Sequence, residues 1–267
     1  MRRNRRGRSS GREQSVEEHY DTHGMEAEPL PQEPDDNFPL RPFAEREVHV
    51  DELPDVPLTD KGPDPARMLR RARRAARGGR RSDALQAYRD LLEIAQDSLE
   101  GRLELARLLE TSGEIDAALT QLSRAVDLAP DKPEVLTERG ALRARLKHYV
   151  EAEADLTRAL QLDPSYAPAL FHSGLVQLRK GRAQGAAASF RQALAGRDDL
   201  PGAYFYLGEA LNLLGDFEPA IDALERATER EPGESRGYQL LGRVLDSCGR
   251  PEEAMIMYRK AREVGRR

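Results

Sequence analysis

The feature that most constrains this chain is a period of 34 residues that runs through its last three quarters. Alanine recurs at this spacing in two series and glycine in a third. The series are Ala84, Ala118, Ala152, Ala186, Ala220 and Ala254; Ala125, Ala159, Ala193, Ala227 and Ala261; and Gly140, Gly174, Gly208 and Gly242. A fixed period of this length predicts a repeat architecture, in which each copy buries its apolar face against its neighbours.

Each copy is predicted to be a pair of antiparallel helices. A small residue in the middle of the first helix lets the second helix approach closely, and the two alanines of the second helix do the same from the other side. A large residue lies three positions before the second alanine series and fills the space between the helices: Leu122, Leu156, Phe190, Leu224 and Tyr258. Glycines such as Gly113 and Gly215 predict turns with positive φ. Prolines such as Pro130 and Pro164 stop the second helices.

Residues 201–234 carry the fullest version of this pattern, with Tyr204, Leu207-Gly208, Leu211, Ala220, Leu224, Ala227 and Pro232. The pattern resembles the tetratricopeptide repeat (TPR) family. This resemblance implies an all-α fold, a right-handed α-solenoid of about six helix-turn-helix repeats. We expect the copies at 65–98, 99–132, 133–166, 167–200, 201–234 and 235–267. Arg139 departs from the family pattern, which has Leu before this glycine.

Residues 1–64 precede the repeats and are predicted to be a disordered tail. Residues 1–12 are basic, with six arginines, and residues 13–64 are acidic and rich in proline. Such a segment buries too little apolar surface to offset the entropy of ordering. Within it, residues 37–58 place apolar side chains among acids, which suits either a solvated linker or a segment that docks in a groove of this chain or of a partner.

The charged start does not predict a signal peptide, because no apolar stretch follows it. No window holds the ~18 apolar residues of a membrane span, and the expected location is cytoplasmic. The single cysteine, Cys248, excludes an intramolecular disulfide and a cysteine-cluster metal site. Glycine-rich nucleotide loops are absent, and scattered residues such as His148 and His172 form no recognisable catalytic set. We therefore predict a protein that is not an enzyme, with no cofactor and no metal.

The remaining surface of interest is the groove lined by the first helices, whose exposed faces point away from the packing glycines. In copies four to six this face carries apolar residues flanked by polar ones: Phe171, Leu175, Leu178, Arg179, Phe205, Glu209, Asn212, Arg236 and Arg243. Phe171 and Phe205 are one period apart, so we expect them to stack along the groove. The alternative is that some of these phenylalanines only pack between copies.

These residues predict an adaptor or scaffold that binds a peptide or helix of a partner protein, as an accessory subunit of a larger assembly. The partner segment would carry apolar anchors and an acidic residue or C-terminus. Self-association through the last copy is a further expectation, because Met255 and Tyr258 have no following helix to cover them.

The alternative function is anion or nucleic-acid binding through two arginine clusters, 2–12 and 67–81, with the repeats as a spacer. In the second cluster the candidate ligands are Arg67, Arg70, Arg71, Arg73, Arg74 and Arg77. No aromatic residues are interleaved with either cluster, which makes nucleic acid the weaker choice. The acidic residues of 13–64 are expected to fold back over the second cluster and compete with external anions.

Overall fold

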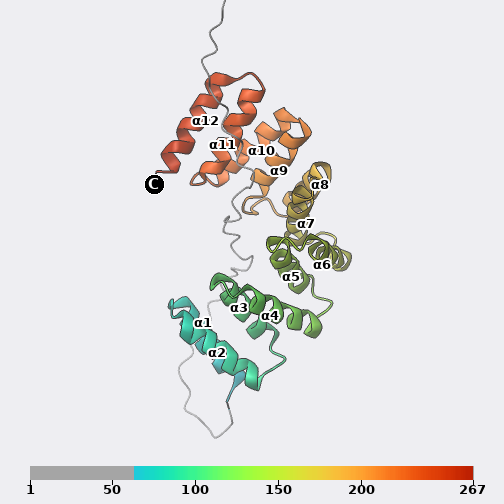
Figure 1. Cartoon of the computed structure of the whole chain (residues 1–267), viewed down its shortest axis with the longest axis vertical. Helices are drawn as coiled ribbons and strands as arrows, with labels where there is room; N and C mark the ends of the chain where they lie inside the picture. The colour runs from blue at the N-terminus through green and yellow to red at the C-terminus, as the bar shows by residue number, and fades with distance from the viewer. Residues whose placement is uncertain (1–62, 267) are drawn as a thin grey trace, which may run out of the picture. The chain divides into compact units, whose positions relative to one another are not determined.

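The computed structural model describes residues 63–266, and this range contains twelve α-helices and no strand (Figure 1). The helices are α1 (Pro65–Arg77), α2 (Arg81–Ile94), α3 (Leu99–Thr111), α4 (Ile115–Leu128), α5 (Pro133–Arg145), α6 (Tyr149–Leu162), α7 (Ala167–Arg179), α8 (Ala183–Gly196), α9 (Ala203–Leu214), α10 (Phe217–Arg230), α11 (Ser235–Ser247) and α12 (Pro251–Val264). None of these helices is long and apolar enough to cross a membrane.

The helices form six pairs, and consecutive helices pack against each other along the whole series. The first helix of each pair begins at the first residue of an expected copy, except for α9, which begins two residues late. There Gly202 adopts φ +69° and precedes the helix, while Leu200 in the connection is buried. The tail predicted for residues 1–64 lies outside the described residues apart from Pro63 and Asp64. Asp64 caps α1 by accepting a hydrogen bond from the Ala66 amide at 3.0 Å.

The two helices of a pair meet at the glycines of the 34-residue series. A Cβ added to Gly174 would lie 2.7 Å from the ring of Phe190, and one added to Gly208 would lie 2.5 Å from Leu224 Cγ. At Gly242 the same construction would place a Cβ 2.6 Å from the Tyr258 ring. Each contact is too short for a real Cβ, so glycine is what allows the large residue of the second helix to fill this space.

The turn inside each pair uses a left-handed residue. Its φ lies between +70° and +81° at Gly79, Gly113, Gly181, Gly215 and Gly249. In the third copy the same place is held by Lys147, with φ +62°. The left-handed region costs a residue with a Cβ roughly 1–2 kcal/mol, so the backbone at Lys147 is locally strained.

Neighbouring copies are joined by buried side chains of both helices. Between copies four and five, Phe171, Phe190 and Tyr206 pack ring against ring, with centroids 5.8 to 6.0 Å apart. The first helices also contact one another directly, α5 with α7, α7 with α9 and α9 with α11. They therefore present one continuous surface, the first-helix face, formed by the side chains of α1, α3, α5, α7, α9 and α11 that point away from the second helices.

Candidate functional site

A half-buried carboxylate on the first-helix face of the last three copies lies within electrostatic range of three arginines from two helices. Glu209 lies on α9, and burial raises its pKa above the ordinary value, while Arg179 of α7 and Arg236 and Arg243 of α11 lower it. Glu209 thus lies within electrostatic range of three of the arginines predicted from the sequence, and Asp246 adds a second carboxylate one turn after Arg243 on α11.

An aromatic ring lies one turn from this cluster. Phe205 is partly exposed, and the Arg236 guanidinium carbon lies 5.3 Å from its ring centroid, a distance suited to a cation–π contact. Because Phe205, Glu209 and Asn212 follow one another at spacings of four and three residues, they share one face of α9. Leu175 on α7 is also half-buried. We call Leu175, Phe205, Glu209 and the three arginines the basic groove.

The prediction that Phe171 lines the groove is wrong. Its side chain is fully buried, and Leu178 is only 9% exposed. Phe171 and Phe205 also do not form the expected stack, because Tyr206 lies between them and meets both rings edge-on, at 5.9 and 5.2 Å. Tyr206 is large enough to fill the gap between α7 and α9, so Phe171 packs between copies rather than facing a partner.

The structure adds one residue that the sequence pattern did not single out. Leu213 lies eight residues after Phe205 on α9 and is 61% exposed. It stands one period after Arg179. The sequence did contain a signal for this residue. Arg145 and Arg179 hold the equivalent position in the two preceding copies, and Leu213 is the apolar residue at that position.

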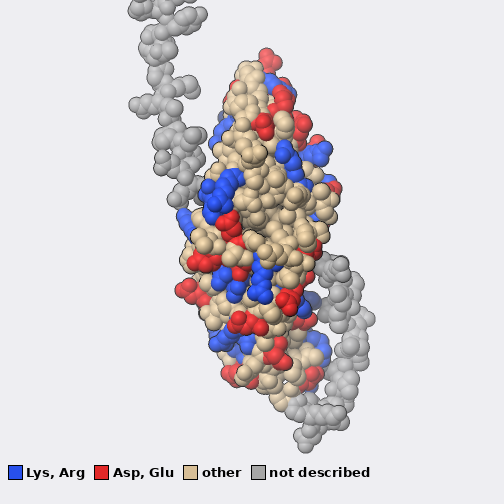
Figure 2. Space-filling model, turned by 90° about the vertical axis from the view of Figure 1, so that its right-hand side faces the viewer, with Lys and Arg blue, Asp and Glu red and all other residues tan. Residues whose placement is uncertain are grey.

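The arginine cluster of α1 is largely exposed. Arg67, Arg70, Arg71, Arg74 and Arg77 all lie on the solvent side of the helix. Arg73 differs from these five, because it donates hydrogen bonds to Glu104 at 2.8 Å and to Glu100 at 3.0 Å. The two carboxylates raise the pKa of Arg73. The prediction that Arg73 binds an external anion is therefore wrong. Figure 2 shows basic and acidic side chains interspersed on the face in view, with no large area of one sign. The cluster 2–12 lies outside the described residues.

The last copy leaves apolar side chains uncovered. Met255 is 59% exposed and Ile256 46% exposed on α12. Tyr258 is half-buried, packs on Gly242 and donates a hydrogen bond to Asp246 at 2.7 Å. The exposed part of this end is therefore formed by Met255 and Ile256 rather than by Tyr258.

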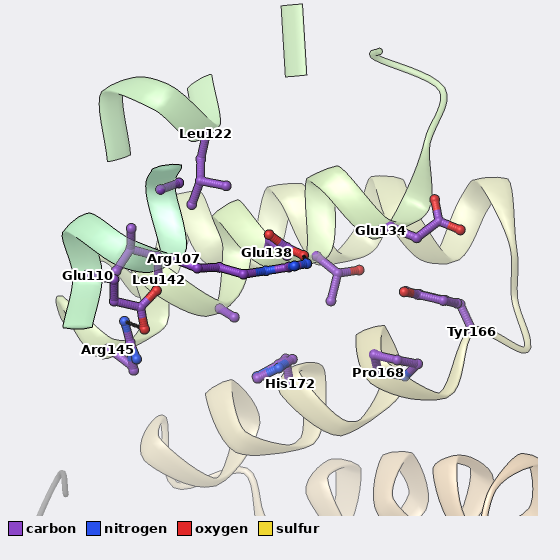
Figure 3. A pocket seen from close by; sticks show the side chains of 13 residues that line it. Arg107, Glu110, Leu122, Glu134, Glu138, Leu142, Arg145, Tyr166, Pro168 and His172 are labelled. Atoms are coloured by element: carbon purple, nitrogen blue, oxygen red, sulfur yellow. Dashed lines mark hydrogen bonds and ion pairs between the residues drawn. The ribbon is translucent and has the colours of Figure 1, made fainter. Parts of the chain in front are cut away.

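A pocket of about 90 Å³ opens on the first-helix face between α3, α5 and α7 (Figure 3). Two ion pairs cross it, Arg107 with Glu138 and Arg145 with Glu110. His172 and Tyr166 point into the same space from α7 and from the residue before it. Burial lowers the pKa of His172 to about 4, with a smaller contribution from Arg145, and burial raises the pKa of Tyr166 to about 12. At neutral pH the His172 ring is therefore uncharged. We call this site the polar pocket.

Comparison with known proteins identifies the repeat. Three models of the tetratricopeptide repeat match the chain, one over residues 75–146 and 177–244, one over 138–201 and one over 235–263. The comparison with curated proteins gave no match.

Solved structures share the fold. MamA is 25% identical, with 61% of this chain and 95% of MamA covered at a TM-score of 0.55. YrrB, described as a TPR protein with an unusual peptide-binding site, is 20% identical over 68% of this chain and 93% of its own, with a TM-score of 0.54. PilW, a type IV pilus biogenesis factor, is 21% identical over 72% and 90%, with a TM-score of 0.66.

These matches confirm the predicted fold class, a right-handed α-solenoid of six helix pairs. They also confirm its general use, because the fold is a scaffold for protein–protein interaction. The chain belongs to the tetratricopeptide repeat family.

Proposed function

We propose that this protein is a non-enzymatic adaptor that holds a segment of a partner protein in the basic groove, as an accessory subunit of a larger cytoplasmic assembly. The observation that carries the proposal is the contact of Arg236 with the partly exposed Phe205 ring, beside a Glu209 carboxylate whose pKa Arg179, Arg236 and Arg243 lower. Guanidinium groups next to an apolar ring suit a segment with an apolar anchor and an acidic side chain or C-terminus.

The two kinds of contact have different tasks in this proposal. Phe205 and Leu213 supply apolar area that a partner removes from water, and such contacts give most of the affinity of a small interface. The arginines offer paired N–H donors to a carboxylate and so set the direction of the bound segment. The peptide-binding site named for YrrB lies in the same fold, which supports peptide capture as a use of this architecture.

The test is affinity capture from native lysate with the full chain as bait. Phe205→Ala combined with Leu213→Ala should lose the partner while the helical content measured by circular dichroism stays the same. The matched control is Val150→Ala combined with Leu162→Ala, because both residues are exposed and apolar but lie on α6. If the groove variant and the control retain the same proteins as the wild type, the basic groove is not the binding surface.

Anion or nucleic-acid binding is a second candidate, favoured by the spacing of the exposed arginines on α1. Arg70 and Arg71 each lie three or four residues from both Arg67 and Arg74, so the four arginines form one basic stripe. Phosphate binding by this stripe would weaken steeply with salt, with a slope of about −0.9 per phosphate contacted on duplex DNA. A shallow slope in a binding titration against duplex DNA would exclude it, and the same titration with residues 13–64 deleted tests the predicted competition by that segment.

Self-association through α12 is favoured by the exposed Met255 and Ile256. Replacing both with lysine should shift a concentration-dependent sedimentation coefficient to that of the single chain. A sedimentation coefficient that does not change with concentration in the wild type would exclude this contact.

A further inference from the structure

Two of the ion pairs that join the first three copies follow one rule. An arginine of one first helix pairs with a glutamate 31 residues later in the next first helix, Arg73 with Glu104 and Arg107 with Glu138. The next step of this Arg–Glu ladder falls on Ala141 and His172, one period further on. A methyl group and a neutral ring replace two long charged side chains there, so the ladder ends between α5 and α7 and leaves space.

That space is the polar pocket. Its volume of about 90 Å³ corresponds to roughly three water molecules of liquid. Leu142 and Pro168 give it apolar walls, and Ala141 leaves it open toward the first-helix face. The pocket therefore has room for the end of one side chain but not for a folded element.

Several polar groups in the pocket have no partner among residues 63–266. His172 is only 8% exposed, and no described residue forms a hydrogen bond with its ring. Arg107 Nε is buried without an acceptor within the described range. The Tyr166 hydroxyl also points into the pocket, and none of the described side chains bonds to it. The His172 ring and the Tyr166 hydroxyl therefore offer unpaired polar atoms to a ligand in the pocket.

The charges of the pocket disfavour an ionic ligand. Arg107 and Arg145 already have their carboxylate partners, and Glu134 adds one further negative charge at the exposed rim. A ligand anion would meet this unbalanced carboxylate, and a ligand cation would lie beside two guanidinium groups. A neutral group that both accepts and donates hydrogen bonds matches the neutral His172 ring and the Tyr166 hydroxyl.

We propose that the polar pocket binds the primary amide of an Asn or Gln side chain carried by the partner segment. The amide nitrogen donates to the unprotonated nitrogen of His172, and the amide oxygen accepts from the Tyr166 hydroxyl. The inference rests on the proposed function for the source of this amide. His172 lies one turn before Leu175 on α7, so a segment that occupies the basic groove continues onto the pocket.

The test uses a small probe, so that it does not depend on groove binding. N-acetyl-glutamine methylamide is titrated into the full chain while the histidine ring signals are followed by NMR. The signal missing from His172→Leu identifies His172. Leucine is tolerated there because Leu240 holds the equivalent buried place two periods on. We expect a saturable shift of this signal with a Kd in the millimolar range.

Ala141→Leu fills the pocket with the residue that the next copy carries at the same place, Leu175. We expect it to weaken probe binding at least tenfold, while the exposed control Ala154→Leu on α6 leaves binding unchanged. Circular dichroism checks that both variants fold. If Phe205→Ala with Leu213→Ala captures the same proteins as the wild type while the probe still binds, the result counts against the proposed function alone.

Comparison probes decide the chemistry. Stronger binding of the corresponding lysine or glutamate derivative would overturn the amide assignment in favour of a cation or an anion. The absence of a saturable His172 shift with the glutamine probe, or equal binding to Ala141→Leu, would overturn the site itself.

Discussion

Arg139 and Asp155 form a two-point contact between the helices of the third pair. Arg139 Nε and Nη2 donate to the two Asp155 oxygens at 2.9 and 2.7 Å, and Arg143 adds a third hydrogen bond at 2.6 Å. The Asp155 side chain is only 6% exposed and that of Arg139 15%. This contact explains why the third copy carries Arg139 where the repeat pattern has Leu, since a charged pair takes the place of an apolar contact.

Asp155→Ala should lower the free energy of unfolding by about 3 kcal/mol, because it leaves the guanidinium of Arg139 largely buried without its partner. The double variant Arg139→Leu with Asp155→Ala should recover most of this loss, since copy five carries Leu207 and Ala223 at these two places. Denaturant unfolding followed by circular dichroism measures both. A double variant less stable than Asp155→Ala would show that the pair contributes more than an apolar contact can replace.

Gly174→Ala should destabilise the array by about 1–3 kcal/mol, the cost of overpacking, although alanine is the better helix former by about 1 kcal/mol. The new methyl group would meet the Phe190 ring, which cannot move away because Phe171 and Tyr206 pack against it. Gly196→Ala is the control, because only Ser165 O lies near, at 3.7 Å. Thermal unfolding should rank Gly174→Ala lowest of the three chains.

Lys147→Gly should stabilise the array by about 1 kcal/mol, since glycine removes the strain of a left-handed residue. The reciprocal change Gly113→Lys in the second copy should cost a similar amount, because Gly113 has φ +81°. The unfolding midpoints of both variants show whether each substitution raises or lowers the stability. A lower midpoint for Lys147→Gly would mean that the lysine side chain contributes more than its backbone costs.

Acid should weaken the fold through His172. Its pKa is about 4 in the folded chain against 6.5 in a free histidine, so between these values the unfolded chain binds the extra proton. Stability therefore rises with pH across this window, is fully present above pH 6.5, and loses up to about 3 kcal/mol toward pH 4. Unfolding titrations at pH 4.5 and 7.5 should show a smaller difference for His172→Leu than for the wild type.

The exposed His148, the residue before α6, provides the control. His148→Leu should keep the acid sensitivity of the wild type. An equal loss of sensitivity in both histidine variants would trace the effect to other groups.

The sequence predicted the helix pairs well, because each pair depends on contacts within 16 residues, such as Gly174 with Phe190. It also predicted that Arg179, Glu209, Arg236 and Arg243 face the same side, since a fixed period places equivalent residues on equivalent helix faces. It could not decide whether such a side chain is covered by the next copy. Phe171 and Phe205 hold the same place in the period, yet Tyr206 buries the first and Arg236 only partly covers the second.

The sequence pattern did not predict the polar pocket, for a related reason. The pocket exists because Ala141 has no long side chain to fill the space, and its polar lining residues come from three different copies. Each of Arg107, Glu138 and His172 alone looks like an ordinary surface or core residue. Only the contact between successive first helices shows that the ladder stops there.

The end of the Arg–Glu ladder also divides the array by its response to dissolved salt. The first helices of copies one to three are tied by Arg73–Glu104 and Arg107–Glu138 in addition to a buried apolar cluster, and mobile ions screen these two pairs. The first helices of copies four and five meet through Phe171 and Tyr206, whose ring contact ions leave unaffected. Rising ionic strength should therefore soften the N-terminal half while the C-terminal half keeps its stiffness, so that the molecule bends more readily at α5 and α7 in concentrated electrolyte than in dilute buffer.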